Sequence, residues 1–428
     1  MMSRRAGSPL GGRSRHGVSL LIKERDFRLI VIAVGLSSLG DVLAAVALTI
    51  RVHDLTGSGL AVAALLLADL AAHVAFAPWA GMLVDRVETV RVLAAVSLGQ
   101  AAVAVALAFT HSVPLLIVLL FLLGAGATVV TPAVLALLPK VVGRDRTTPA
   151  NASLEIARYA GATAGPVVAG VLAGTLGTGA ALLADAGSFA ALAIAAAALR
   201  VRRPPDDVGA GEGAAGLWRG KAREGFSFLW GEPVLRLAAV VLTITVVFAV
   251  MDNVALVFFA KDTLEAGDGG YGTLVSVWTA GMVAGIFLVA RRLGTQALAP
   301  GVILADASTG VAVLAAAAWP VFPLAVGLFV VGGAGNGIGN VARRSLIHHR
   351  TPDRLHGRVF AANAALLSSG QIAAVALGGI LVEAIGPRGT LLLAGAGTVA
   401  VSTIGLGAYA SLPAAVKRRT VPRDDVAS

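Results

Sequence analysis

Several ionisable side chains lie inside long apolar stretches of the chain, where a charged group is costly and usually serves a function. Two of them, Asp69 and His73, are four residues apart and therefore share one face of a helix. A carboxylate beside a histidine can exchange a proton near neutral pH. The sequence thus predicts proton transfer within the apolar region, and the candidate carriers are Asp41, Asp69, His73, Asp185 and Asp252.

Other polar residues in these stretches have simpler interpretations. Asp306 lies about one helical turn inside its stretch, where it can cap a helix or reach the polar boundary. Glu155 and Arg158 are three residues apart and can form a structural ion pair at a helix end. Neutral groups that can line a path or bridge helices are Asn253, Asn336, Asn340 and Gln371.

The composition excludes several kinds of chemistry. The chain has no cysteine, so disulfides and cysteine-ligated metals are excluded, and its histidines are scattered, so we expect no metal site. No Gly-x-x-x-x-Gly-Lys-Ser/Thr sequence is present to cradle the phosphates of ATP. We expect no cofactor. If the protein were an enzyme, Asp69 and His73 would be the only cluster of side chains that could perform its catalysis.

The apolar stretches are long enough to cross a membrane. The 428 residues are 57% hydrophobic and 14% charged, whereas a soluble domain usually has about 25% charged residues. A membrane-spanning helix needs about 20 mostly apolar residues. The sequence has six such runs, a polar gap and six more: Leu29–Ile50, Leu60–Val84, Val92–Thr110, Val113–Leu138, Ala150–Leu172, Gly179–Leu199, Leu237–Ala260, Gly270–Ala290, Val302–Trp319, Val321–Val341, Ala361–Ile385 and Gly389–Ala410.

Basic residues gather on one side of this topology. Nearly all lysines and arginines of the loops share a side with both termini, and the other side receives only Arg51, Lys261 and Arg388. By the positive-inside rule we predict a multi-pass protein of a bacterial cytoplasmic membrane, with both termini in the cytoplasm. The net charge of +10 is then an orientation signal that faces anionic lipid. We expect contact with membrane lipid and no binding of nucleic acid.

The polar gap divides the chain into two halves. Within it, Trp218, Ala222, Phe226 and Leu229 have helical spacing with basic residues between them, which is typical of an amphipathic helix at a membrane surface. The fold class we predict is an all-α membrane protein with two pseudo-symmetric six-helix bundles. Its parts are a tail (1–28), a bundle (29–199), a linker (200–233), a second bundle (234–410) and a second tail (411–428).

An internal repeat relates the two halves. Ala150-Asn151-Ala152 recurs as Ala362-Asn363-Ala364, and each copy follows a proline and an Asp-Arg pair and precedes spaced glycines. Two repeated six-helix halves are typical of a transporter that rocks around a site at the membrane midplane.

The loop after the second predicted span reads Gly81-Met82-Leu83-Val84-Asp85-Arg86 and continues to Arg91. This order resembles the loop between helices 2 and 3 in the major facilitator superfamily. Gly81 permits a close helix approach, and Asp85 can pair with a cation or a helix N-terminus. The resemblance implies a conformational latch made by Gly81, Asp85, Arg86 and Arg91. Further basic residues are usual in the family where this chain has Thr89 and Val90, so we expect a weaker latch.

The fifth predicted span resembles the Gly-Pro element of exporters in the same superfamily. Small residues every three or four positions let backbones touch and the proline permits a bend, at Gly161, Gly165, Pro166 and Gly170. Gly40-Asp41 and Ala184–Phe189 are similar to the bacterial branch that includes enterobactin and macrolide exporters. The fourth span lacks the arginine of many drug–proton antiporters, so their proton relay is not implied.

These features predict a secondary active transporter that is not an enzyme. We expect it to export a small amphipathic organic compound, drug-like or siderophore-like, in exchange for protons and by alternating access. The partners are then a small-molecule substrate and protons, and the protein acts as a monomer. An importer or a lipid carrier of the same fold is the alternative, and an intramembrane enzyme or sensor is a remote one.

Overall fold

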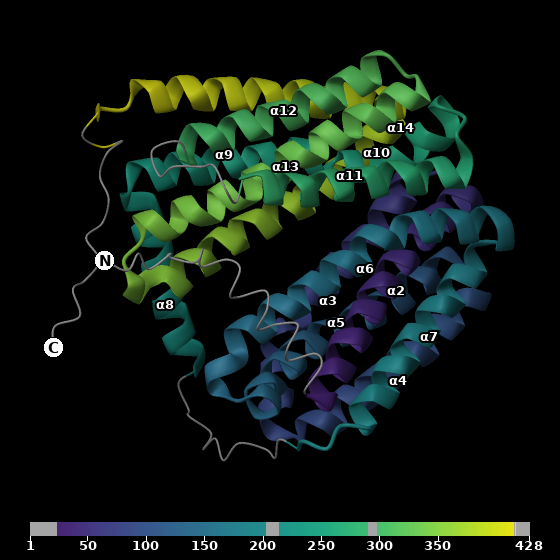
Figure 1. Cartoon of the computed structure of the whole chain (residues 1–428). Helices are drawn as coiled ribbons and strands as arrows, with labels where there is room; N and C mark the ends of the chain where they lie inside the picture. The colour runs from purple at the N-terminus through teal and green to yellow at the C-terminus, as the bar shows by residue number, and fades with distance from the viewer. Residues whose placement is uncertain (1–23, 203–213, 290–297, 415, 417–428) are drawn as a thin grey trace, which may run out of the picture. The chain divides into compact units, whose positions relative to one another are not determined.

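The computed structural model describes residues 24–202, 214–289, 298–414 and 416, and the regular structure of these residues is entirely helical. Helices form because the apolar runs satisfy their backbone hydrogen bonds internally, as a chain in hydrocarbon must. The first half contains α2 to α7 (Figure 1), which are Arg25–Thr56, Gly59–Arg86, Thr89–Phe109, Val113–Val142, Thr147–Leu176 and Thr178–Ala197, with a 3₁₀ turn at Arg144–Arg146.

The second half contains α8 to α14, with a π-helical segment and a second 3₁₀ turn. Their bounds are Ala214–Gly231 (α8), Pro233–Val250 (α9), Asp252–Phe258 (α10), Phe259–Thr263 (π-helix), Gly267–Val289 (α11), Leu298–Ala318 (α12), Phe322–Arg350 (α13), Asp353–Leu355 (3₁₀) and His356–Ser411 (α14).

Among the described residues, eleven helical segments are long and apolar enough to cross a membrane. The last of them, α14, contains two spans, because Gly386 breaks the helix with φ 74° and ψ 170° and Pro387 follows it. Only a glycine adopts such a backbone conformation readily. Counting α14 as two spans confirms the predicted twelve-helix membrane fold.

The predicted spans are correct in number and order, and they differ from the helices mainly at their ends. α13 continues to Arg350, nine residues beyond the predicted end at Val341. Ala342 and Leu346, four residues apart, are buried in this extension, so one face of it packs although its sequence is polar. The amphipathic segment of the linker is helical as predicted and forms α8.

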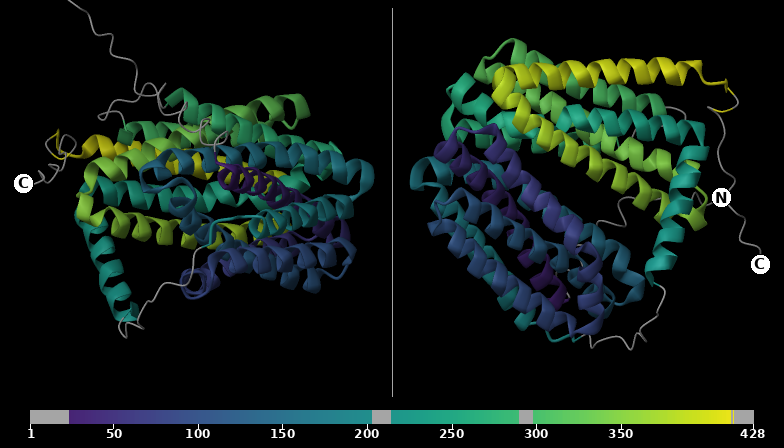
Figure 2. Two further views of the ribbon diagram at one scale, coloured as in Figure 1. Left: turned by 60° about the horizontal axis from the view of Figure 1, so that its bottom comes forward. Right: turned by 180° about the vertical axis from the view of Figure 1, so that it is seen from behind.

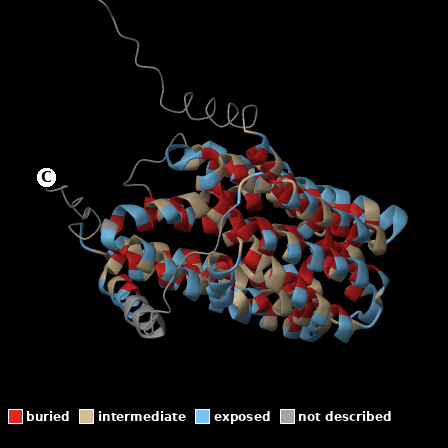
Figure 3. Ribbon diagram, turned by 90° about the horizontal axis from the view of Figure 1, so that it is seen from below, coloured by how far each residue is buried: buried red, intermediate tan, exposed pale blue. Residues whose placement is uncertain are grey.

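The chain forms two compact units. The first comprises residues 1–51 and 68–209, and the second comprises residues 52–67 and 210–428. The turn between α2 and α3 thus belongs to the second unit, which the sequence did not indicate. The views in Figures 1 and 2 show the helices of each unit running side by side, except α8, which is steeply inclined to the other helices of its unit. Buried and exposed residues alternate along each helix in Figure 3, as expected where one face meets neighbouring helices.

In the first unit, glycines bring α6 against α2. A Cβ atom on Gly161 would lie 2.4 Å from the carbonyl oxygen of Gly35, and one on Gly165 would lie 2.8 Å from Cβ of Val42. Gly161 therefore lets the backbones of α6 and α2 touch, and Gly165 makes room for the Val42 side chain. α4 packs on the other side of the unit, against α5 and α7.

In the second unit, α11 and α13 approach each other through glycines on both helices. A Cβ on Gly281 or Gly285 would lie 2.2 Å from a carbonyl oxygen of α13, and one on Gly333 or Gly337 would lie 2.1 Å from a carbonyl oxygen of α11. This reciprocal arrangement is the small-xxx-small packing of membrane helices.

Three cations, Arg51, Lys261 and Arg388, lie on the side of the predicted topology that has few basic residues. Each of them binds other groups of the protein. Arg51 is buried and donates to the carbonyl oxygens of Leu107, Ala108 and Thr110, at the C-terminal end of α4. Arg388 does the same at the end of α12, on the carbonyl oxygens of Ala317 and Ala318. Cations suit helix C-terminal ends, where carbonyl groups lack partners.

The third cation, Lys261, fixes the turn between α2 and α3 to the rest of the second unit. Its Nζ lies 2.5 Å from carboxylate oxygens of both Asp54 and Asp268. His53 bridges Asp54 and Asp262, with ring-nitrogen distances of 2.9 Å and 3.2 Å.

Candidate functional site

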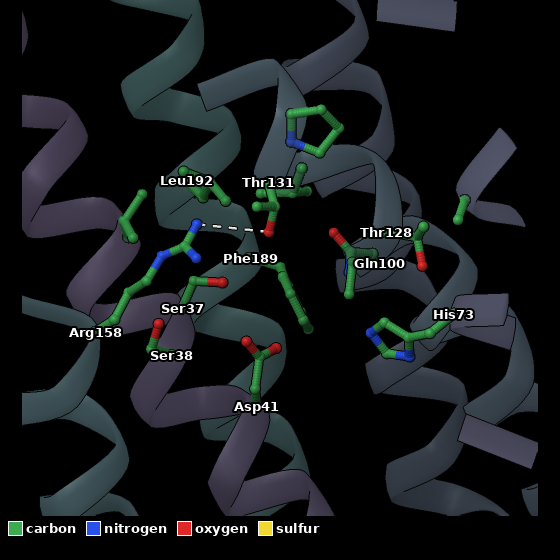
Figure 4. A pocket seen from close by; sticks show the side chains of 15 residues that line it. Ser37, Ser38, Asp41, His73, Gln100, Thr128, Thr131, Arg158, Phe189 and Leu192 are labelled. Atoms are coloured by element: carbon green, nitrogen blue, oxygen red, sulfur yellow. Dashed lines mark hydrogen bonds between the residues drawn. The ribbon is translucent and has the colours of Figure 1, made fainter. Parts of the chain in front are cut away.

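A cavity of about 500 Å³ lies inside the first unit, within helices that are long and apolar enough to span a membrane. Residues from α2 to α7 line it (Figure 4). The apolar part of its wall includes Val34, Phe189 and Leu192, and the polar part is formed by Ser37, Ser38, Asp41, His73, Gln100, Thr128, Thr131 and Arg158. A cavity with an apolar wall and a few converging polar groups is the usual form of a small-molecule site.

Asp41 is the acidic residue in this wall. It lies on α2 directly after Gly40, and its side chain is exposed to the cavity although membrane-spanning helices surround it. Four charged or titratable groups of the same unit are within electrostatic range of its carboxylate: Asp69, His73, Arg158 and Asp185. The structure therefore places the first of the predicted proton carriers where a bound solute can reach it.

His73 lines the same cavity from α3, and Asp69 lies one turn before it. The ring Nδ1 of His73 lies 2.9 Å from the backbone carbonyl oxygen of Asp69 and 3.8 Å from its carboxylate. The two residues share a helix face, as their spacing predicted. The contact within hydrogen-bond distance is with the backbone rather than with the carboxylate.

Asp185 lies on α7, fully buried beside α2. Its Oδ1 accepts a hydrogen bond of 3.2 Å from Ser188, and its Oδ2 has no partner among the described residues. A Cβ on Gly40 would be 2.3 Å from Oδ1, so the absence of a side chain there makes room for the carboxyl group. Asp185 thus lies next to the backbone segment that carries Asp41.

Arg158 faces the cavity from α6, whereas the sequence suggested a structural ion pair at a helix end. α6 begins at Thr147, so Arg158 lies about three turns inside the helix. Its Nη2 is 3.5 Å from Oγ1 of Thr131, and its Nη1 is 3.9 Å from Oε1 of Glu155. The ion pair with Glu155 exists, but it is long.

Gln100, on α4, is a cavity residue that the sequence analysis did not identify. It is buried, its Nε2 donates to the carbonyl oxygen of Leu123 at 3.2 Å, and its Oε1 has no partner among the described residues. Gly126 makes room for it, because a Cβ there would lie 2.7 Å from the Gln100 side chain. The available signal was a glutamine in an otherwise apolar run, where an uncharged amide needs a hydrogen-bond partner.

The remaining acidic candidates belong to the second unit. Asp252 is buried at the start of α10, directly after the end of α9. Asp306 is also buried and pairs with Arg343 at 3.4 Å, so it has a cationic partner and need not reach the polar boundary. Arg343 also contacts Asn340, which in turn donates to Asn336 at 2.9 Å.

The predicted latch lies where α3 ends and α4 begins. Arg91 pairs with Glu88 at 2.7 Å, and Glu88 also contacts Arg202 at 3.4 Å. The close helix approach expected at Gly81 is not found, because no heavy atom among the described residues lies within 4 Å of a Cβ built there. Gly81 is on a partly exposed face of α3, and the latch role of Asp85, Arg86 and Arg91 stays a prediction.

The sequence profile of the Major Facilitator Superfamily matches residues 30–305, which is more than half of the chain. The chain belongs to the major facilitator superfamily. Membership of this family makes it a multi-pass membrane transporter of a small molecule rather than an enzyme. Among curated proteins, none matches the chain in sequence.

Solved structures of the same fold support this assignment. The nucleoside transporter NupG has a TM-score of 0.74 at 14% identity, with 90% of this chain and 99% of that chain covered. A bacterial homologue of the iron transporter ferroportin, in an inward-facing state, has a TM-score of 0.67 at 14% identity, with coverage of 90% and 98%. A POT family transporter in complex with 5-aminolevulinic acid has a TM-score of 0.69 at 10% identity, with coverage of 90% and 96%. At these identities the likeness concerns the fold alone.

Proposed function

We propose that this protein exports a small amphipathic organic compound across a bacterial cytoplasmic membrane in exchange for protons. The observation that carries the proposal is the cavity of the first unit, where Asp41 and His73 meet an apolar wall inside membrane-spanning helices. Acidic residues at membrane depth that face a cavity are typical of proton pathways in transporters.

Asp41 is the residue to which we assign the proton. It is open to the cavity, whereas Asp185 is fully buried and Asp69 has a half-exposed side chain outside the cavity wall. A proton and the donor group of a solute compete for the same carboxylate, so binding of one releases the other. This competition is the simplest physical basis for exchange.

The direction of export rests on the Gly-Pro element of α6. Gly161 and Gly165 hold α6 against α2, and Pro166 lies inside the helix. The similarity of this element to exporters of the superfamily favours export over import. The alternative, an importer or lipid carrier, has no contact in the structure that favours it specifically.

The test uses inverted membrane vesicles that contain the full-length protein. After respiration has acidified their interior, a transported compound should partly dissipate the pH gradient, and Asp41→Asn should abolish this response. Asp145→Asn is the matched control, because Asp145 is an exposed loop residue and its loss should leave the response intact. Western blotting of the vesicles confirms that each variant is inserted.

A screen for resistance and intracellular accumulation in cells with and without the protein identifies the compound and the direction. Lower accumulation in expressing cells is the expected result. Higher accumulation would identify an importer and would refute export, and a normal proton response in Asp41→Asn would remove Asp41 from the coupling.

A further inference from the structure

Arg158 is a cation at membrane depth whose guanidinium has only weak partners. Its two polar contacts among the described residues are the 3.5 Å approach to Thr131 and the 3.9 Å approach to Glu155. Charge-assisted hydrogen bonds normally measure about 2.7–2.9 Å, and a guanidinium has five N–H donors. Most of the hydrogen-bonding capacity of Arg158 is therefore unused by the protein.

The two arginines that are buried among the described residues, Arg51 and Arg350, show what a structural arginine looks like here. Arg51 makes hydrogen bonds of 2.6 Å, 2.8 Å and 3.1 Å to three acceptors, besides a longer one. Arg350 pairs with Glu232 at 2.9 Å and also donates to a backbone carbonyl oxygen. Arg158 differs from both, because among the described residues it has neither a close carboxylate nor a set of helix-end carbonyl oxygens.

Glu155 does not neutralise Arg158 effectively. Its side chain is 51% exposed, and it lines a separate hollow with Thr147, Asn151 and neighbouring residues of α5 and α6. An exposed ion pair of this length contributes little energy. Arg158 instead directs its guanidinium toward the wall that contains Ser37, Thr131 and Leu192 (Figure 4).

The same cavity contains a charge of the opposite sign. Asp41 lies within electrostatic range of Arg158, and the two side chains enter the cavity from different helices, α2 and α6. Phe189 and Leu192 supply apolar surface in the same wall. A solute that is complementary to this wall has an acidic group for Arg158, a cationic group for Asp41 and an apolar body for Phe189 and Leu192.

We propose that the substrate is an amphoteric organic compound whose acidic group binds Arg158 and whose ammonium group binds Asp41. The inference rests on the proposed function and names the substrate class of the same site. It also fits proton exchange, because an ammonium group and a proton compete for Asp41. An acid without an amine would leave Asp41 free to keep its proton, so that proton and solute would bind together.

The test compares four probes that share a phenyl body and differ in charge. They are phenylalanine, phenethylamine, 3-phenylpropanoate and 3-phenylpropanamide, and their binding to the full-length protein in lipid nanodiscs is measured by calorimetry. Phenylalanine should bind about tenfold more tightly than either singly charged probe, as expected for one additional charge-assisted hydrogen bond. The neutral amide should bind most weakly.

Variants separate the two contacts. Arg158→Gln should make phenylalanine and phenethylamine bind equally, and Asp41→Asn should make phenylalanine and 3-phenylpropanoate bind equally. Arg158→Lys should keep a reduced preference for the acid, because it keeps the charge but not the planar fork. Glu155→Gln is the control and should leave all four affinities in their wild-type order.

Three results would overturn the inference. The first is absence of a preference for phenylalanine in the wild type, including absence of binding by any probe. The second is an Arg158→Gln variant that weakens all four probes by the same factor, which indicates a structural role. The third is a Glu155→Gln variant that reproduces the effect of Arg158→Gln, which would make the ion pair the functional unit.

The outcome for the substrate class can be distinguished from the outcome for the proposed function. If phenylalanine is preferred but dissipates no pH gradient in the vesicle assay, proton exchange is refuted and the assignment of Arg158 stands. If only amines or neutral compounds dissipate the gradient, exchange stands and the amphoteric substrate is refuted.

Discussion

The contact between α6 and α2 at Gly161 makes a quantitative prediction about stability and function. Gly161 lies three residues after Arg158 on α6, and the backbone it touches, at Gly35 and Leu39, precedes Asp41 on α2. Replacing Gly161 with alanine places a methyl group between the two helices that position the charged residues of the cavity.

The magnitude follows from the distances. The new Cβ would lie 2.4 Å from the carbonyl oxygen of Gly35, whereas ordinary contact begins at 3.4 Å. The helices must therefore separate locally by about 1 Å. The obstacle is backbone, which cannot rotate away as a side chain can. Overpacking of this kind costs about 1–3 kcal/mol. A displacement near 1 Å can also impair a binding geometry strongly.

Gly174→Ala is the matched control, because Gly174 lies on the same helix and no heavy atom of the described residues is within 4 Å of its Cβ position. Alanine there should be neutral or stabilising by at most about 1 kcal/mol, from helix propensity. Stability is measured as the midpoint of heat-induced loss of the monodisperse protein in detergent. Transport is measured as dissipation of the pH gradient in vesicles.

We expect Gly161→Ala to unfold at a lower temperature than Gly174→Ala and to lose most of its transport. Gly161→Val should be worse on both measures. Equal stability of Gly161→Ala and Gly174→Ala would refute the reasoning, since it would show that α2 and α6 are not in backbone contact at this position.

Two further predictions concern the packing of the two units. Arg51→Met should destabilise the protein by about 2–3 kcal/mol in a denaturant titration, because the carbonyl oxygens at the end of α4 lose a charged donor; an unchanged midpoint would show that water replaces the arginine. Gly333→Ala should destabilise the protein by about 1–3 kcal/mol, because its Cβ would lie 2.1 Å from the carbonyl oxygen of Trp278. Gly327→Ala on the same helix is the control, because its Cβ would have no heavy atom of the described residues within 4 Å. Similar melting temperatures for these two variants would contradict the close packing of α11 on α13.

The membrane fold was predictable because its signal is local. A run of about 20 apolar residues can satisfy its backbone in hydrocarbon only as a helix, whatever it packs against. The division of α14 at Gly386 was also visible, because a glycine and a proline follow one another between two apolar runs. The polar extension of α13 to Arg350 was missed, because its buried face is short and depends on contacts with α9 and α14.

The candidate site was predictable in part. The presence of ionisable residues inside apolar runs identified Asp41 and His73, which line one cavity, and Asp185, which lies beside it. The same criterion selected Asp252, which the structure buries in the second unit. It could not rank these residues, because access to a cavity depends on the rotation of each helix about its axis. That rotation is set by packing at residues such as Gly40 and Gly161.

Arg158 illustrates why arginines are the hardest residues to interpret from sequence. Arg51, Arg158 and Arg343 all lie within helices of the membrane-spanning type, and sequence spacing offers two of them an acid three residues away, Asp54 for Arg51 and Glu155 for Arg158. In the structure Arg51 donates to helix-end carbonyl oxygens instead, Arg343 lies 3.4 Å from Asp306 and 3.2 Å from Asn340, and Arg158 has contacts of 3.5 Å and 3.9 Å. The helix-end carbonyl oxygens and Asp306 come from distant parts of the chain. Sequence spacing alone therefore does not distinguish an arginine held by the protein from one with donors left for a ligand, and our proposal for Arg158 rests on its long contacts in the structure.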